Sequence, residues 1–445
     1  MKRALLAALV GALALPAAAP TLAVAQAQAP ARVDARAAAN DIATLIEENF
    51  YNEARGREIA AELRTRANSG GFDRFTNPLD LATAFTALLH PYDGHFNVSY
   101  RPGDSGPAPS GGPPSPEQQR TFFERQQAAA ARANFGFRRV EMLPGGVGYI
   151  MIDQFAGIDA RDANDPAKQA ADAAMDLVAN ARAVILDLRD SRGGSPAMVA
   201  YIASHFVAAD ADIFNTFHSR RGTRTEAPVA EPAGGRRLDA PLYVLVNGAS
   251  GSASESLPYT LQAARRATIV GEITDGRANP GGFYPTPQGF AVFISSGTPV
   301  NPITGRNWEG TGVIPDVQTP SAEALSRAHI LALQQLTDLD PQSDAAAESR
   351  AALEALTAET RTLSARALGA YVGDYGERDV ELVDGQLRMR VGRRPPAVLR
   401  AIGEDVFVND ANPMGRVRFE RDGRGQVVAF ETSGPNAPTA RFLKM

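Results

Sequence analysis

The chain has 445 residues, of which 44% are hydrophobic and 21% charged, an ordinary globular composition with enough apolar material for a core. Its 45 Lys and Arg against 50 Asp and Glu residues give a net charge of −5 without an extended basic run, which argues against nucleic acid as a partner. Cysteine is absent, so disulfides, cysteine-based zinc sites and thiol nucleophiles are excluded. The length predicts about two or three domains.

The first residues have the layout of a secretory signal peptide. Lys2 and Arg3 precede an apolar run from Ala4 to Leu15, and a small-residue stretch ending in Ala23-Val24-Ala25 follows. The run is shorter than the roughly 20 residues that span a bilayer. We therefore expect residues 1–25 to be a signal peptide and the mature protein to be periplasmic or secreted, without a transmembrane segment. An N-terminal anchor that stays uncut is the alternative.

Helical periodicity marks the next part of the chain. Ile42, Leu45, Ile46 and Phe50 recur at helical spacing, which predicts an N-terminal helical subdomain over residues 35–100. Residues 101–135 begin with a proline-, glycine- and serine-rich stretch and continue with a run rich in Gln, Arg and Ala. This composition predicts a linker followed by a helix.

From residue 136 apolar strands alternate with helices. The strands predicted at 147–152, 183–188 and 242–246 are apolar without alternation, as expected for strands covered on both faces. Further strands are predicted at 268–270 and 291–294, with helices between the strands and a helical tail from 321. The pattern predicts an α/β core over residues 136–340.

The last part of the chain changes to a period of two. Apolar residues alternate with polar ones in several short segments, and turns such as Asp384-Gly385 and Asp422-Gly423 separate them. We expect residues 365–445 to form a small all-β domain.

One strand-to-helix turn carries a cluster of serines. The buried strand ends at Val246, a glycine-containing turn follows, and a helix is predicted to begin near Ser252. A serine there is exposed beside free backbone N–H groups and the positive end of a helix dipole, as a nucleophile requires. The alternative is structural, because Ser252 and Glu255 also have capping-box spacing.

A second turn has a complementary composition. The strand ending near Leu188 leads into Gly193-Gly194, and paired glycines allow backbone N–H groups to approach a ligand closely. An ordinary left-handed turn is the alternative. Because both turns follow strands of one α/β unit, we expect them to face a common crevice.

Together these segments resemble the tail-specific, or C-terminal processing, serine peptidases, in particular their tricorn-like and interphotoreceptor retinoid-binding-protein-like branch. The resemblance covers roughly residues 35–340. It is carried by Asp187-Leu188-Arg189 with Gly193-Gly194, by Ser252-Ala253-Ser254-Glu255, by Val270-Gly271-Glu272-Ile273-Thr274-Asp275-Gly276, and by Asn307-Trp308-Glu309-Gly310-Thr311-Gly312-Val313-Ile314-Pro315-Asp316.

The resemblance implies a fold and a set of roles. The fold would be an α/β, ClpP/crotonase-like core of stacked β-β-α units. Ser252 would be the nucleophile, and the N–H groups of Ala253, Gly193 and Gly194 would form the oxyanion hole. No cofactor is implied, and no His, Asp or Glu pair shows a metal-ligand spacing.

The base that activates Ser252 is the main departure from the family. Many members have a lysine where this chain has Arg277, and an arginine cannot accept a proton in a protein. The tricorn-like branch uses an upstream histidine and a downstream glutamate, which here correspond to His95 and Glu309. That branch has a serine where Gly94 stands, so either Asp93 or Glu309 could orient His95.

The other histidines are weaker candidates, and among them only His90 competes with His95. The segment from 101 to 147 is too short for an inserted PDZ domain, since domains rarely fall below about 50 residues. Capture of substrate ends would therefore fall to the N-terminal helices, the proline-rich segment or the β domain. We expect an exported serine peptidase of the Ser-His-Glu type that acts on peptide or protein substrates. The alternative is a catalytically inactive member that binds a hydrophobic ligand or peptide.

Overall fold

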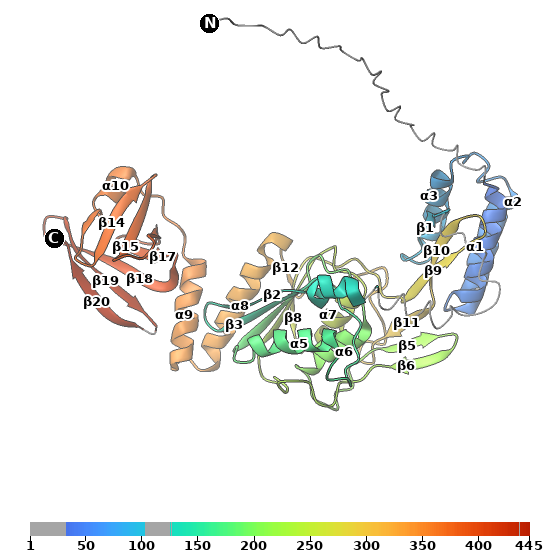
Figure 1. Ribbon diagram of the computed structural model, residues 1–445, viewed down its shortest axis with the longest axis horizontal. Coiled ribbons are helices and arrows are strands. Elements are labelled where there is room, and N and C mark those ends of the chain that lie inside the picture. The colour runs from blue at the N-terminus through green and yellow to red at the C-terminus, as the bar shows by residue number, and fades with distance from the viewer. Residues whose placement is uncertain (1–32, 103–124, 126, 436) are drawn as a thin grey trace, which may run out of the picture.

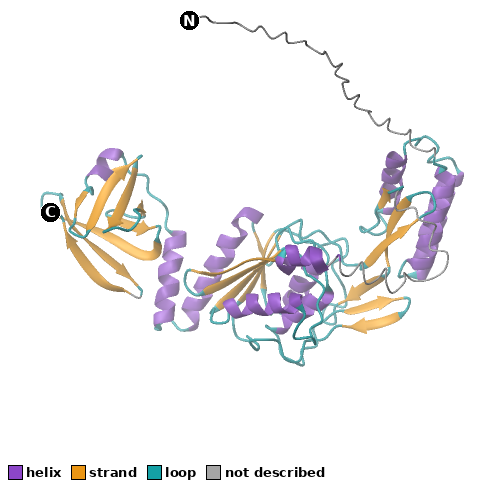
Figure 2. Ribbon diagram, in the orientation of Figure 1, coloured by secondary structure: helices purple, strands orange, loops and turns teal. Residues whose placement is uncertain are grey.

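The computed structural model describes residues 33–102, 125, 127–435 and 437–445. The expected signal peptide (1–25) and most of the predicted linker lie outside these residues. Helices at the N-terminal end, a mixed central sheet and a C-terminal all-β part confirm the expected α/β class with helical and β additions (Figures 1 and 2). Among the described residues, no helix has both the length and the apolar character needed to cross a membrane.

The N-terminal unit packs three helices on a small sheet. The helices are α1 (Ala35–Asn49), α2 (Glu53–Asn68) and α3 (Pro78–Leu89), and the side chains of Asp34, Asn52 and Asn77 cap their first turns. The sheet has the order β1-β10-β9, from β1 (Val98–Tyr100), β9 (Gly281–Pro285) and β10 (Phe290–Ser295). Residues 281–295, which the sequence analysis grouped with the α/β core, therefore pair with the N-terminal unit instead.

The central sheet has the order β12-β8-β7-β4-β3-β2. Its strands are β2 (Phe137–Leu143), β3 (Val147–Ile152), β4 (Ala183–Asp187), β7 (Leu242–Val246), β8 (Thr268–Gly271) and β12 (Val317–Gln318). All neighbours are parallel except β2 and β3. The carboxyl ends of β4 and β7, which precede the two predicted turns, consequently lie at one edge.

Helices cover both faces of this sheet, which explains the lack of alternation in its strands. The helices α5 (Pro166–Leu177), α6 (Pro196–Ser204) and α7 (Ala253–Ala263) share one apolar core with Val244 and Val246. The helix α8 (Ala324–Leu339) packs on the opposite face, against Tyr243 and Leu245. The helix α9 (Asp344–Thr357) packs beside α8. Two single-turn 3₁₀ helices, η1 (Asn134–Gly136) and η2 (Ser321–Glu323), complete this part.

A third sheet lies between the core and the N-terminal unit (Figure 1). Its order is β11-β5-β6, from β5 (Thr216–Ser219), β6 (Gly222–Thr225) and β11 (Gly297–Val300).

The C-terminal part is an antiparallel meander preceded by the short helix α10 (Ala365–Gly369). Its strands pair in chain order and are β13 (Gly373–Asp374), β14 (Arg378–Val383), β15 (Gln386–Val391), β16 (Ala397–Ala401), β17 (Val406–Asn409), β18 (Asn412–Arg421), β19 (Val427–Gly434) and β20 (Ala437–Leu443). Tyr371, Phe407, Phe419 and Phe430 fill its separate core.

Candidate functional site

Ser252 stands on a sharp turn between β7 and α7. It has φ 58° and ψ −120°, a backbone conformation that a residue with a side chain rarely adopts. Such strain persists where the surrounding structure enforces it, and it is typical of a nucleophile presented at the end of a strand. The first turn of α7 begins at the next residue, Ala253.

The side chain of Glu255 holds this turn through hydrogen bonds. Its fully buried carboxylate accepts hydrogen bonds from the Ser252 N–H at 2.8 Å and from Thr274 Oγ1 at 2.6 Å. It also accepts from the N–H groups of Gly276 at 2.6 Å and Arg277 at 2.9 Å. Burial raises the pKa of Glu255, although these hydrogen bonds oppose the increase. The carboxylate therefore ties the serine turn to the loop that follows β8.

The two glycines at 193 and 194 pack directly against the serine turn. Both have positive φ, at 91° and 135°. A Cβ added to Gly193 would lie 2.6 Å from the Gly251 carbonyl oxygen and 2.8 Å from the Ser252 Cβ. Only glycine permits this approach together with this backbone conformation. The two turns that were predicted to face a common crevice are thus in contact.

The backbone N–H groups around Ser252 differ in availability. The Gly193 N–H donates to Ser254 Oγ at 3.0 Å, and Ser254 Oγ lies 2.6 Å from Ser191 Oγ. The N–H groups of Gly194 and Ala253 donate to no acceptor within the part of the chain that the structure describes. Of the three predicted oxyanion donors, Gly194 and Ala253 are therefore free to bind a ligand oxygen, whereas Gly193 is engaged.

His95 lies in the turn between α3 and β1, enclosed by two carboxylates. Its Nδ1 is 3.3 Å from Asp93 Oδ1 and 3.5 Å from Glu309 Oε1. The His95 side chain is 10% exposed, and its ring stacks on Phe293 with centroids 5.5 Å apart. The backbone N–H of His95 also donates to Asp93 Oδ1 at 2.8 Å. Both acids considered as partners of His95 thus lie beside it.

The loop after β8 holds these two acids in place. Glu309 Oε2 accepts from the N–H groups of Ala278 at 2.7 Å and Asn279 at 3.0 Å. Asn279 Nδ2 donates to Asp93 Oδ2 at 3.1 Å. Because Glu255 binds the same loop two residues earlier, one short segment connects the serine turn with the histidine cluster.

The charges of this cluster control the protonation of His95. Burial alone lowers the pKa of His95, but hydrogen bonding and charge interactions with Asp93 and Glu309 outweigh it and raise the pKa to about 9. Burial likewise raises the pKa of Asp93, and hydrogen bonds and the charge of His95 reverse this and lower it. The cluster thus stabilises the imidazolium form, as the acid of a catalytic triad does.

Neither ring nitrogen of His95 forms a hydrogen bond within the described part of the chain, to Ser252 or to any other group; Nδ1 lies at ion-pair distance from the two carboxylates. The structure connects the two residues through Glu255, the 276–279 loop and Glu309. Arg277, at the position of the family lysine, pairs with Asp275 at 2.9 Å and is half exposed. Lys168 pairs with Asp172 and Lys444 donates to the Ala370 carbonyl, so neither lysine contacts the site.

The remaining histidines lie elsewhere. His205 is buried at the C-terminal end of α6, and its ring forms hydrogen bonds with the carbonyls of Tyr201 and Ala233. His329 is buried in α8, and its ring forms a hydrogen bond with the Pro144 carbonyl. Burial lowers the pKa of both. His90 is exposed at the end of α3, and His218 is exposed on β5.

The sequence analysis missed Asn279 and Phe293, and it named Ser254 only as a member of the Ser252–Glu255 motif, without a role. Each of the three supports a candidate residue through a contact between distant segments. The ligand atoms of Asp93, His95 and Glu309 lie within 4.8 Å of one another and form the one His/carboxylate group of metal-site dimensions among the described residues. Attraction between imidazolium and two carboxylates accounts for the same spacing.

The comparisons with known proteins match the α/β part of the chain. Residues 146–319, which contain the serine turn, the paired glycines and Glu309, match the family model described as Peptidase family S41. The family match covers this part of the chain, 174 of its 445 residues. Members of the family are serine peptidases, a class of hydrolases.

Individual relatives share the family but match only part of their length. The Arabidopsis thaliana carboxyl-terminal-processing peptidase 1 is 27% identical over 215 residues, covering 47% of this chain and 42% of the relative. The carboxyl-terminal-processing protease of a Picosynechococcus strain is 30% identical over 179 residues, 39% of either chain. The solved photosystem II D1 C-terminal processing protease is 16% identical with a TM-score of 0.39, covering 70% of this chain and 98% of that one. The chain thus spans less than half the length of these two sequence relatives.

Proposed function

We propose that the protein is a serine peptidase in which Ser252 is the nucleophile and His95 the general base, supported by Glu309 and Asp93. The observation that carries this proposal is the pairing of His95 Nδ1 with two carboxylates while Nε2 has no partner among the described residues. An imidazole placed in this way has one nitrogen facing the carboxylates and the other available for proton transfer.

The chemistry is acyl transfer. His95 Nε2 takes the proton of Ser252 as Oγ attacks the carbonyl carbon of the substrate, and the negative oxygen of the tetrahedral intermediate binds the N–H groups of Gly194 and Ala253. When the C–N bond breaks, His95 gives the proton to the departing amine. Water, deprotonated by His95, then hydrolyses the acyl-enzyme and restores Ser252.

Glu309 is the acid that we assign to the triad, and Asp93 acts as a second carboxylate. Glu309 Oε2 is held by two backbone N–H groups, so Oε1 is presented to the imidazole in a fixed direction. Asp93 is almost completely buried and stabilises the imidazolium from the same edge. A Ser-Lys mechanism is disfavoured because Arg277 cannot act as a base and is paired with Asp275.

We further propose that the core has the ClpP/crotonase-like arrangement and that the protein is exported to the periplasm or secreted. The basic, apolar and small residues before Ala25 support export. N-terminal sequencing of the protein recovered from a periplasmic fraction or the medium should begin after Ala25. An intact Met1 on the recovered protein would contradict cleavage.

Peptide turnover tests the catalytic assignment. Casein and short peptides should be cleaved by the wild-type chain, and Ser252→Ala and His95→Ala should each reduce kcat by about 10³-fold or more. His90→Ala is the matched control and should retain turnover. Arg277→Lys should not restore activity to His95→Ala. Turnover that survives loss of both Ser252 and His95 would contradict the proposal, and apolar ligand binding without turnover would favour an inactive member.

A further inference from the structure

The cluster of Asp93, His95 and Glu309 contains buried polar atoms whose bonding is incomplete. His95 Nδ1 and Glu309 Oε1 are both buried, and neither has a hydrogen-bond partner among the described residues. The side chains of His95 and Asp93 are 10% and 2% exposed. Burying a polar atom without a partner is costly, so a ligand that bonds these atoms is favoured.

The distances within the cluster fit a bound metal ion better than hydrogen bonds. His95 Nδ1 is 3.3 Å from Asp93 Oδ1 and 3.5 Å from Glu309 Oε1. A charged N–H···O hydrogen bond is shorter, at about 2.7–2.9 Å. Two ligands of a tetrahedral zinc ion, each about 2.0–2.2 Å from the metal, lie roughly 3.3–3.6 Å apart. Attraction between charges explains why the three groups gather, but it does not explain why their contacts are longer than hydrogen bonds.

Each carboxylate is held by its second oxygen, which leaves the first oxygen for an ion. Glu309 Oε2 accepts from the N–H groups of Ala278 and Asn279, and Asp93 Oδ2 accepts from Asn279 Nδ2. Hydrogen bonds of this kind orient the ligands of a metal. Asp93 Oδ1 accepts the backbone N–H of His95 and keeps a second lone pair. The three ligand atoms lie within 4.8 Å of one another, so a shift of Glu309 Oε1 by roughly 1 Å closes them around one ion.

Gly94 leaves room for a fourth ligand. A Cβ added there would have Glu309 Oε1, at 3.7 Å, as its one neighbour within 4 Å among the described residues beyond those adjoining Gly94. One imidazole nitrogen, two carboxylate oxygens and a water molecule make a tetrahedral set that suits Zn²⁺, whereas Mg²⁺ requires octahedral oxygen ligands. The two carboxylates also balance the charge of a divalent ion.

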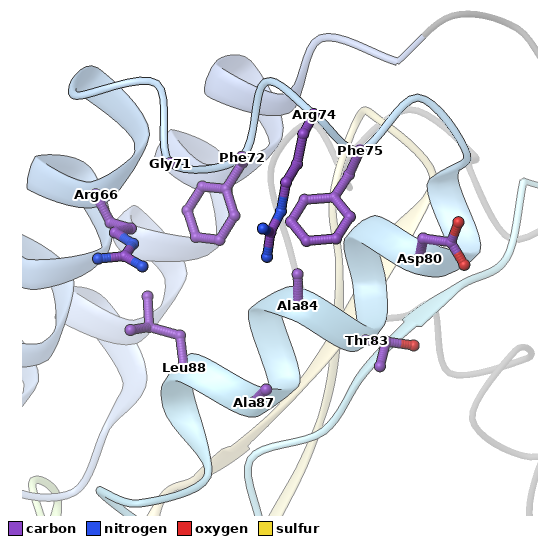
Figure 3. A pocket seen from close by; sticks show the side chains of 10 residues that line it. All are labelled: Arg66, Gly71, Phe72, Arg74, Phe75, Asp80, Thr83, Ala84, Ala87 and Leu88. Atoms are coloured by element: carbon purple, nitrogen blue, oxygen red, sulfur yellow. The ribbon is translucent and has the colours of Figure 1, made fainter.

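The pocket of the N-terminal unit has no comparable ligand set. The end of α2, the loop after it and α3 line this pocket, in which Asp80 is accompanied by Arg66 and Arg74 (Figure 3). One carboxylate beside two guanidinium groups does not favour a divalent cation. Asp80 is therefore a suitable control, because it is an acid of the same unit that lies outside the cluster.

We propose that Asp93 Oδ1, His95 Nδ1 and Glu309 Oε1 bind a zinc ion. The binding is independent of the proposed peptidase function, but its consequence rests on that function. A neutral imidazole carries one ring proton, so an ion on Nδ1 leaves that proton on Nε2, and a proton displaced from Nδ1 passes to water. Nε2 then cannot accept the proton of Ser252. Zn²⁺ is thus an inhibitor, and the metal-free chain is the active form.

Binding is measured by isothermal titration calorimetry with ZnCl₂ and the full chain carrying Ser252→Ala, so that turnover plays no part. We expect one ion per chain. Adding His95→Ala, Asp93→Asn or Glu309→Gln should weaken binding at least tenfold, because each removes a ligand. MgCl₂ should bind at least about tenfold more weakly than ZnCl₂.

Asp80→Asn and His90→Ala are the matched controls for the acids and for the histidine, and each should leave the zinc affinity within about twofold. Circular dichroism checks that every variant is folded. In the wild-type chain, peptide turnover should fall over the ZnCl₂ concentrations at which the ion binds, and EDTA should restore it.

The proposal is overturned if Zn²⁺ does not bind the folded Ser252→Ala chain, or if either control weakens binding as much as Asp93→Asn. It is also overturned if Mg²⁺ binds equally well, or if a bound zinc ion leaves turnover unchanged. A chain that binds one zinc ion with this ligand dependence but cleaves no peptide, even after EDTA, would support this inference and contradict the peptidase function. A chain that cleaves peptides but binds no zinc would do the reverse.

Discussion

At the scale of single residues, the proposed chemistry depends on the protonation of His95. Two carboxylates within 3.5 Å of Nδ1 stabilise the charged imidazole, and its pKa is raised to about 9. A general base must be unprotonated to accept a proton, so in the proposed mechanism His95 would be mostly in the unreactive, protonated form at neutral pH. In the proposed mechanism the same carboxylates would stabilise the imidazolium that forms during acylation, and the pH optimum would be alkaline.

The pH dependence of kcat/KM reports this balance. The wild-type value should rise by about tenfold per pH unit below the pKa of His95 and level off near pH 9, since deprotonation creates the active base. Glu309→Gln removes one negative charge, so the pKa of His95 should fall. The rising part of the kcat/KM profile, its acidic limb, should therefore move to lower pH by roughly one unit. His90→Ala should leave the limb in place. A limb that does not move in Glu309→Gln would exclude Glu309 as the partner of His95.

Most candidate residues could be identified from the sequence, but the contacts between them could not. Ser252, the paired glycines and Glu309 stand in local motifs. Because position 277 is an arginine and not a lysine, a histidine was expected as the base, and His95 was the candidate. Whether Asp93 or Glu309 orients His95 could not be decided, because both depend on tertiary packing. Asn279 binds Asp93 across distant segments, and nothing in its sequence neighbourhood indicates that role.

At the scale of elements, the site depends on two turns in contact. The serine turn and the paired glycines follow adjacent parallel strands, β7 and β4, and Gly193 has no room for a side chain against Ser252. The apolar runs of these strands predicted burial on both faces, and the helices on each side account for it. The strands β9 and β10 were grouped with the core because their pairing with β1 joins segments far apart in the sequence.

Gly193→Ala tests the contact between the two turns. The new Cβ would collide with the Gly251 carbonyl and with Ser252, and alanine is strained at φ 91°. We expect kcat to fall at least tenfold and the free energy of unfolding to decrease by roughly 1–3 kcal/mol. Gly157→Ala, where nothing lies within 4 Å of the added Cβ, should change neither quantity. Urea denaturation and peptide turnover measure both, and an unimpaired Gly193→Ala enzyme would contradict the proposed packing.

At the scale of the whole molecule, the candidate residues come from two units, and the β meander contributes none. His95 and Asp93 belong to the N-terminal unit, whereas Ser252 and Glu309 belong to the α/β part. The meander has its own aromatic core, and its connection to α9 includes the contact of Arg416 with the Ala351 carbonyl at 3.0 Å. This division follows the change of period that the sequence shows near residue 365.

A chain ending at Ala358 should therefore keep the candidate site. We expect turnover of short peptides within about twofold of the full chain, because no residue of the site lies beyond Glu309. Because the meander has its own core, one of two thermal unfolding transitions should disappear. Circular dichroism checks folding, and steady-state kinetics checks activity. A folded but inactive truncated chain would show that the meander contributes to catalysis.

Labelling by a fluorophosphonate, located by mass spectrometry, tests the central claim directly, because the reagent reacts with a serine only when a base activates it. We predict a single adduct on Ser252 in the wild-type chain and a labelling rate reduced by about 10³-fold in His95→Ala, with the variant still folded. Labelling at another serine, or an unchanged rate in His95→Ala, would contradict the proposed pair of Ser252 and His95.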